Sequence, residues 1–289
     1  PAWSRNGEFV ASIEMPDGEK WVADTDTFDT WFSSGQWPLI MTDYPDGPDF
    51  KTYYPTDIME TGHDLIFKWV PRMVIFGLYL SGKSPFQTVY LHGLVNDAQG
   101  KKMSKSKGNV INPLTLTSKY GTDALRMTLI VGNTPGTDLA LQEQRVKGYK
   151  NFANKIWNIT RYTITSTENW DGKKPEKIND TNQKILDELQ NLIIDVTLDM
   201  DNYRFYMAAE KLYHYVWHTF ADKIIEESKE NLKSEDLEKI ASTQYMLRHI
   251  LETSLALLHP FMPFISEEIW GTIPHFEEKK LLMVTDWPK

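Results

Sequence analysis

The 289-residue sequence contains no cysteine, which excludes disulfide bonds, thiolate zinc sites and cysteine nucleophiles within this chain. It also lacks a long apolar run. The most apolar stretch, residues 65–80, is too short to span a bilayer and is interrupted by Lys68, Pro71 and Arg72. No signal-peptide or transit-like segment opens the chain. From these absences we expect a soluble cytoplasmic protein.

Positive charge is in the minority. The sequence has 31 Lys and Arg against 40 Asp and Glu, a formal net charge of −9. This balance argues against a protein that coats nucleic acid by bulk charge, although it leaves room for a local basic patch. The 41% of apolar and 25% of charged residues are typical of a globular protein, and the length allows about two domains.

The first part of the chain, to about residue 140, mixes strand and helix patterns. A helical pattern starts after Gly62, kinks or restarts at Pro71 and ends at Gly82, and further helix starts are indicated at Asn112 and Thr122. The expected strands are 9–14 and 20–22, paired as a hairpin, and 86–91; the expected loops are 35–54 and 98–109.

The rest of the chain is predicted to be helical. Residues 141–165 show apolar residues at the i, i+3, i+4 spacing of an amphipathic helix, namely Val146, Tyr149, Ala153, Ile156, Trp157 and Thr160. Further helices are expected at 182–199, 203–228, 235–258 and 265–270. The fold class is therefore α/β over residues 1–140, followed by an all-α bundle over residues 141–289.

A lysine-rich segment carries the clearest chemical signal. Between Gly100 and Lys119 there are five lysines and no acidic residue, and four of the lysines fall within seven residues. Small residues allow a ligand to approach the backbone, and ammonium groups complement phosphate. A mobile polyphosphate clamp is one interpretation; a solvated basic loop is the other.

Within this segment, Lys102-Met103-Ser104-Lys105-Ser106 is identical to the KMSKS signature of the class I aminoacyl-tRNA synthetases. Two further segments, residues 92–95 and 26–34, resemble the valine member of that family. Residues 259–270 resemble a segment near the end of the group's anticodon-binding bundle. The resemblance covers essentially the whole chain.

The resemblance implies the second half of a Rossmann-like catalytic domain at 1–140 and an anticodon-binding domain at 141–289. It implies ATP-dependent ligation of valine to tRNA(Val) through valyl-adenylate, with Mg²⁺ carried by ATP and no metal bound by the protein itself. Lys102 and Lys105 would stabilise charge on the phosphates. The residues implied to bind ATP are His92, Gly93, Met103, Ser104, Lys105 and Ser106.

Residues 61–69 resemble the start of the helix that lines the family's amino-acid pocket. By this resemblance Asp64 would pair with the valine ammonium, and Trp31, Leu65 and Trp69 would form an apolar wall. Without the resemblance, a carboxylate in a first helical turn is a routine partner of the helix dipole, and both tryptophans would be ordinary core residues.

A basic helix face follows the predicted catalytic part. Lys147, Lys150 and Arg161 fall within an arc of about 60° at 100° per residue, together with Asn154. We interpret this face as a tRNA contact, with a solvated helix face as the alternative.

Two features of the family are missing. The chain begins without Met, and we find neither a first ATP signature of the His-x-Gly-His type nor an editing domain. We therefore expect a monomeric piece of a longer protein that cannot activate valine alone. The isoleucine member of the family and a non-catalytic tRNA-binding module remain the alternative functions.

Overall fold

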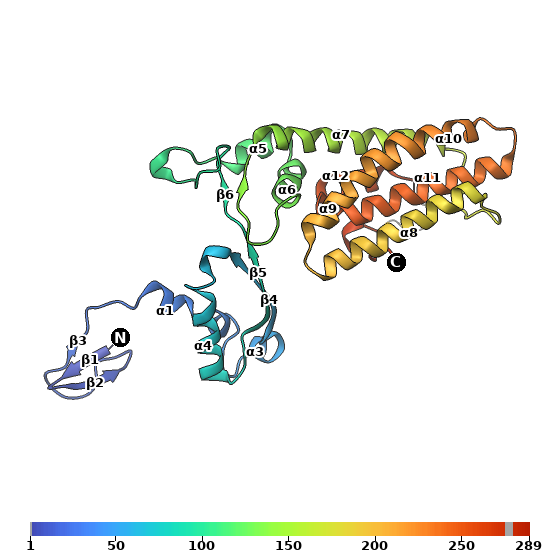
Figure 1. Ribbon diagram of the computed structural model, residues 1–289. Coiled ribbons are helices and arrows are strands. Elements are labelled where there is room, and N and C mark those ends of the chain that lie inside the picture. The colour runs from blue at the N-terminus through green and yellow to red at the C-terminus, as the bar shows by residue number, and fades with distance from the viewer. Residues whose placement is uncertain (1, 275–279) are drawn as a thin grey trace. The chain divides into compact units, whose positions relative to one another are not determined.

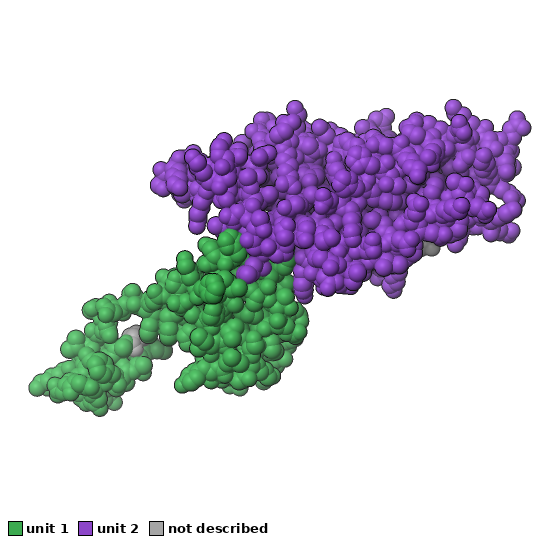
Figure 2. Space-filling model, viewed as in Figure 1, with its two compact units in different colours: residues 1–90 green, residues 91–289 purple. Residues whose placement is uncertain are grey.

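The computed structural model describes residues 2–274 and 280–289, and the chain divides into two compact units, residues 1–90 and 91–289 (Figure 2). Figure 1 labels most of the helices and strands of the two units.

The first unit opens with a three-stranded antiparallel sheet in the order β2-β1-β3. The turn between β1 and β2 is made by Asn6 and Gly7, whose φ angles of 50° and 85° suit a tight hairpin. The hairpin expected between 9–14 and 20–22 is wrong, because β3 pairs with β1. The strands are β1 (Ala2–Arg5), β2 (Glu8–Ala11) and β3 (Val22–Ala23).

Short helices replace the loop expected at 35–54. Pro38 and Pro48 each lie in a first helical turn, where the missing N–H costs nothing, and this explains why a Pro-rich stretch is helical here. The helices of this region are α1 (Thr30–Ser34), α2 (Trp37–Ile40) and α3 (Pro48–Tyr53).

The helical pattern after Gly62 is not one helix. A 3₁₀ turn, His63–Leu65, comes first, and α4 (Val70–Ser81) starts afresh with Pro71 in its first turn. The expected restart at Pro71 and the end at Gly82, with φ 74°, are confirmed. A two-stranded sheet of β4 (Thr56–Gly62) and β5 (Phe86–His92) completes this part, and β5 is the strand predicted at 86–91.

The second unit begins with a small parallel pair, β6 (Val95–Asn96) and β7 (Leu139–Ala140), and two helices between them. Both predicted helix starts are confirmed. The Asn112 side chain accepts a hydrogen bond from the N–H of Leu114 at 3.0 Å and so caps the first helix. These helices are α5 (Pro113–Tyr120) and α6 (Thr122–Ile130).

The predicted helix bundle is confirmed. One continuous rod passes from α9 through a π-helical stretch, Tyr215–Ile224, into α10 (Figure 1). The apolar faces of the bundle helices share one core with α5 and α6. The helices are α7 (Glu143–Ser166), α8 (Asp180–Asp201), α9 (Phe205–His214), α10 (Ile225–Leu232), α11 (Leu237–Leu258) and α12 (Pro263–Thr272), followed by a 3₁₀ turn, Leu282–Val284.

A buried carboxylate joins α6 to α12. Asp123 is 6% exposed and accepts hydrogen bonds from the backbone N–H groups of Phe264, at 3.3 Å, and Ile265, at 2.7 Å. It therefore satisfies two donors at the start of α12 that have no partner within the helix. Burial raises the pKa of Asp123, and the two backbone hydrogen bonds oppose that shift.

We expect Asp123→Ala to lower the free energy of unfolding by about 2–3 kcal/mol, because two buried donors lose their acceptor. Urea denaturation followed by circular dichroism measures this loss, and Asp187→Ala, at an exposed aspartate of α8, is the control. The folded chain binds a proton at Asp123 more tightly than the unfolded chain, in which the carboxyl has its ordinary pKa of 3.8. The difference in unfolding free energy between wild type and Asp123→Ala therefore decreases as pH rises from 3.8 through the folded-state pKa. Equal stability of the Asp123 and Asp187 variants would contradict this role.

Candidate active site and nucleic-acid interface

The lysine loop lies between β6 and α5. Its start is held by the β6–β7 pair, in which Val95 is opposite Leu139 and Asn96 is opposite Ala140. Asp138 strengthens this pair, because its carboxylate accepts hydrogen bonds from the Leu94 N–H at 2.8 Å and from the Asn96 amide at 3.3 Å. The loop therefore leaves from a well-anchored strand.

The tip of the loop is a 3₁₀ turn, Lys105–Lys107, closed by Gly108 with φ 67°. Lys102 and Lys105 are exposed, as a charge-stabilising role requires. Met103 is half-buried, and its sulfur accepts a hydrogen bond from the Ile111 N–H at 3.4 Å. The loop thus holds its apolar residue inward and presents its ammonium groups to solvent.

His92 and Gly93 lie just before β6. The His92 Nδ1 is 2.8 Å from the Gly93 carbonyl oxygen. Gly93 is buried, and a Cβ there would overlap the backbone carbonyl of Thr137 and lie 2.7 Å from the Asp138 nitrogen. The absence of a side chain at Gly93 is therefore required by packing, independently of any nucleotide.

The residues assigned to the amino-acid pocket belong to the first unit. Trp31 lies on α1, whose start is capped by the Asp29 side chain. The Trp69 indole N–H donates to the Ser34 carbonyl at 2.8 Å and so joins the end of α1 to the start of α4. This contact brings the segments of Trp31 and Trp69 together.

Asp64 and Leu65 lie in the 3₁₀ turn that precedes α4. The Asp64 side chain is exposed and Leu65 is half-buried. The Leu65 carbonyl accepts a hydrogen bond from the Trp69 N–H at 2.9 Å, which folds the turn onto the start of α4. The turn that holds Asp64 and Leu65 is therefore tied to Trp69 at the start of α4.

The basic face of α7 is solvent-exposed as predicted. Lys147, Lys150, Asn154 and Arg161 all lie on the exposed side of the helix. Trp157 differs from the other residues of the apolar series: its side chain is 37% exposed, because one residue beyond buried Ile156 the helix has turned by about 100°. Trp157 borders the basic face about 20° from Lys150 around the helix axis.

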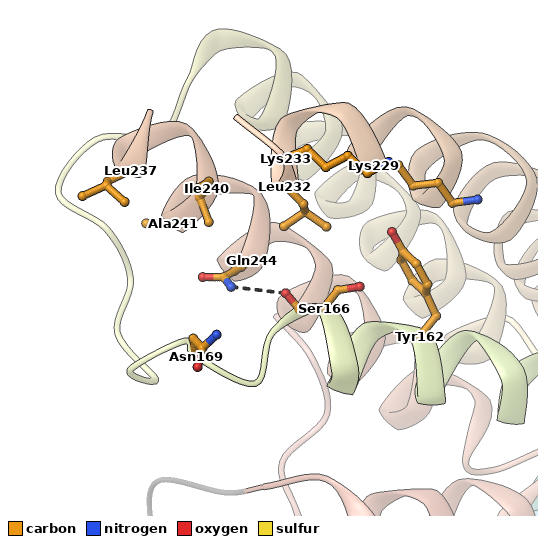
Figure 3. Close-up of a pocket in the computed structure, with 10 residues that line it drawn as sticks. All are labelled: Tyr162, Ser166, Asn169, Lys229, Leu232, Lys233, Leu237, Ile240, Ala241 and Gln244. Atoms are coloured by element: carbon orange, nitrogen blue, oxygen red, sulfur yellow. Dashed lines mark hydrogen bonds between the residues drawn. The ribbon is translucent and has the colours of Figure 1, made fainter. Parts of the chain in front are cut away.

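A groove of about 680 Å³ opens at the C-terminal end of α7 (Figure 3). Half-buried Leu232 and Ile240 contribute apolar surface, and Lys229 and Lys233 contribute positive charge. The Gln244 amide donates to the Ser166 carbonyl at 3.2 Å across it. The sequence did not reveal the groove or the exposure of Trp157, because both depend on how the helices pack.

Comparisons with known proteins match both parts of the chain. The family model for tRNA synthetases class I (I, L, M and V) matches residues 4–142, and the model for the anticodon-binding domain of tRNA ligase matches residues 182–289. Along its whole length the chain is 42% identical to a valine–tRNA ligase of Bacillus subtilis and 44% identical to one of Bacillus cereus. The chain belongs to the class I tRNA synthetases.

This class I synthetase chain spans about a third of the length of those curated relatives, 33% in each case. Solved structures agree on the fold. LeuRS from Agrobacterium radiobacter, in a ternary complex with tRNA and LeuAMS, gives a TM-score of 0.74 at 21% identity over 93% of this chain and 33% of that chain. Methionyl-tRNA synthetase of Mycobacterium tuberculosis with methionyl-adenylate gives 0.72 at 24% identity over 84% of this chain and 50% of that chain.

Two other kinds of feature are absent from the described part of the synthetase chain. Among residues 2–274 and 280–289, no group of three or more His, Cys, Asp or Glu is arranged to hold a metal ion. Within the same residues, no helix combines the length and the apolar character needed to cross a membrane.

Proposed function

We propose that this chain takes part in the ATP-dependent ligation of valine to tRNA(Val) through a valyl-adenylate intermediate. The observation that carries the proposal is the KMSKS loop, identical to the family signature, in a chain 42–44% identical to valine–tRNA ligases along its whole length. The catalytic contribution is assigned to residues 1–140 and tRNA binding to residues 141–289.

The chemistry needs no protein nucleophile. The valine carboxylate attacks the α-phosphorus of ATP, and pyrophosphate leaves with both electrons of the broken P–O bond. The task of the protein is to position the reactants and to stabilise the charge that develops on the phosphates. We assign this charge stabilisation to Lys105, assisted by Lys102, with Mg²⁺ entering as part of the ATP substrate.

The remaining contacts follow from the same assignment. His92, Gly93, Met103, Ser104 and Ser106 would hold ATP along the strand end and the loop. Asp64 would pair with the valine ammonium beside Trp31, Leu65 and Trp69, and its exposure leaves the carboxylate accessible to a ligand. The hydrogen bond from the Trp69 indole N–H to the Ser34 carbonyl at the end of α1 supports the shape of this apolar wall.

The test is ATP–pyrophosphate exchange by the full-length protein, with valine and isoleucine assayed side by side. We expect exchange that depends on valine, with isoleucine at least about tenfold poorer, since one methylene in an apolar pocket is worth about 10–200-fold. Preference for isoleucine would favour the isoleucine enzyme. Tight tRNA binding without any exchange would favour a non-catalytic tRNA-binding module.

The basic face of α7 is proposed to contact the tRNA backbone. Replacing Lys147, Lys150 and Arg161 together with alanine is expected to weaken tRNA binding. The slope of log Kd against log salt concentration should also fall by about 2 to 3, about one for each lost phosphate contact. Filter binding of tRNA between low and high salt measures both effects. Asn154 is proposed to add a hydrogen bond on the same face.

A matched control removes the same charge elsewhere. Lys184, Lys223 and Lys239 are exposed on other parts of the bundle, and their triple alanine variant lowers the net charge equally. If both triple variants lose the same affinity, bulk charge rather than the α7 face is responsible, and the assignment fails.

A further inference from the structure

Two side chains at opposite ends of the lysine loop are hydrogen-bonded to each other. The Asn109 amide donates to the Asp97 carboxylate at 2.7 Å, although the two residues are twelve positions apart. Asp97 is only 7% exposed and Asn109 is half-buried. This bond closes the base of the loop.

Asp97 also organises the first half of the loop. Its other carboxylate oxygen accepts backbone hydrogen bonds from Gln99 at 3.0 Å and Lys101 at 2.8 Å. The Asp97 backbone N–H in turn donates to the Lys101 carbonyl at 2.9 Å. The Asn109 hydrogen bond is the largest influence that lowers the pKa of Asp97, so this carboxylate is ionised at neutral pH.

Asn109 organises the second half. Its side-chain oxygen accepts from the Ser104 N–H at 3.0 Å, and its amide also donates to the Lys102 carbonyl at 3.3 Å. The backbone on both sides of Met103 is thereby held, and the residue after Ser104 is Lys105. The exposed turn that carries Lys105 thus projects from a clamped base.

We propose that Asp97 and Asn109 are positioning residues, which set the backbone that aims Lys102 and Lys105 at the reacting phosphates. The inference rests on the proposed function of the loop. Neither side chain needs to touch substrate. Their contribution is to restrict an otherwise flexible loop, because a displacement of about 1 Å in a charge-stabilising group can cost about 100-fold in rate.

The hydrogen-bond directions allow a sharp test. In Asp97→Asn, the NH₂ group of the new side chain would face another donor, either the Asn109 NH₂ group or the backbone N–H groups of the loop. Rotating the Asn109 side chain would remove the first clash, but it would turn the Asn109 NH₂ group towards the Ser104 N–H, which is also a donor. In Asn109→Asp, two carboxylates would face each other. In the reciprocal swap Asp97→Asn with Asn109→Asp, donor and acceptor match again between the two side chains. The weaker bond to the Lys102 carbonyl, at 3.3 Å, is lost, and a carboxylate oxygen faces that carbonyl instead.

We expect each single variant of the full-length protein to lower kcat for ATP–pyrophosphate exchange by about 10- to 100-fold, with KM for valine unchanged. The swap should restore kcat to within about threefold of wild type. Asp187→Asn, at an exposed helix position, is the control for the same chemical change. A merely structural role would reduce the fraction of folded protein and leave kcat per folded molecule at the wild-type value.

Limited trypsin digestion gives a readout that does not depend on activity. Cleavage after Lys101 and Lys102, located by mass spectrometry, should be about tenfold faster in the single variants and should return towards the wild-type rate in the swap. If wild type shows no valine-dependent exchange, the proposed function fails while the trypsin result still tests the clamp. If wild type is active, a swap that does not restore both kcat and protection overturns the clamp, even where a single variant fails to fold.

Discussion

Lys105→Ala is expected to lower valine-dependent ATP–pyrophosphate exchange by about 100-fold or more while changing the KM for valine little. Lys105 lies in the exposed 3₁₀ turn at the tip of the loop, beyond the residues held by Asp97 and Asn109. Its ammonium would meet the phosphates as negative charge builds on them, an interaction that is stronger in the transition state than in the ground state. Removing one such donor typically costs about 10²–10³ in kcat.

Lys107→Ala is the matched control for this prediction. Lys107 lies two residues away in the same exposed turn, so its removal changes the net charge and the local field by a similar amount. We expect a loss of about twofold at most from Lys107→Ala, measured as initial rates of exchange in the full-length protein. Comparable losses at Lys105 and Lys107 would show that the loop acts through diffuse charge and would defeat the assignment of Lys105.

Gly93→Ala is expected to lower the free energy of unfolding of the chain by about 3 kcal/mol or more. The added Cβ would overlap the Thr137 carbonyl and crowd the Asp138 nitrogen, and both are backbone atoms beside the β6–β7 pair. Backbone atoms cannot move aside as the end of a flexible side chain can. Displacing this strand pair would also move the start of the lysine loop. Urea denaturation followed by circular dichroism measures the loss.

Gly148→Ala provides the comparison. Gly148 lies within α7, and apart from the backbone of its own helix a Cβ there would meet nothing within 4 Å. This substitution is expected to stabilise the chain by up to about 1 kcal/mol, because alanine favours the helix and restricts the unfolded chain. If Gly93→Ala proves as stable as wild type yet loses ATP binding, the glycine is kept for the nucleotide rather than for packing.

Local signals in the sequence predicted much of the fold. Asn112, Pro71 and Gly82 each determine what the backbone can do at their own position, and the helix boundaries they indicate are confirmed. The hairpin error shows the limit of such signals. The expected hairpin of 9–14 with 20–22 would turn at Pro16-Asp17-Gly18. The Asn6-Gly7 pair is the stronger hairpin signal, and it forms the observed β1–β2 turn.

The candidate site, like the fold, could be predicted from the sequence only in part. The lysine loop could be recognised from its residues alone, because five consecutive residues match a family signature. The hydrogen bond between Asp97 and Asn109, the crowding of Gly93 by Thr137, and the exposure of Trp157 were not predicted. Each depends on where a second segment lies in space, which spacing along the chain does not reveal.

By itself, the sequence determined the α/β-then-helical fold class, the family resemblance and the position of the charged loop, since composition, backbone preferences and motifs are properties of neighbouring residues. Only the tertiary structure decided which strands pair, how far Trp157 is exposed and what holds the loop at its base. Those outcomes arise from contacts between residues far apart in the chain, where burial and hydrogen-bond direction select one arrangement.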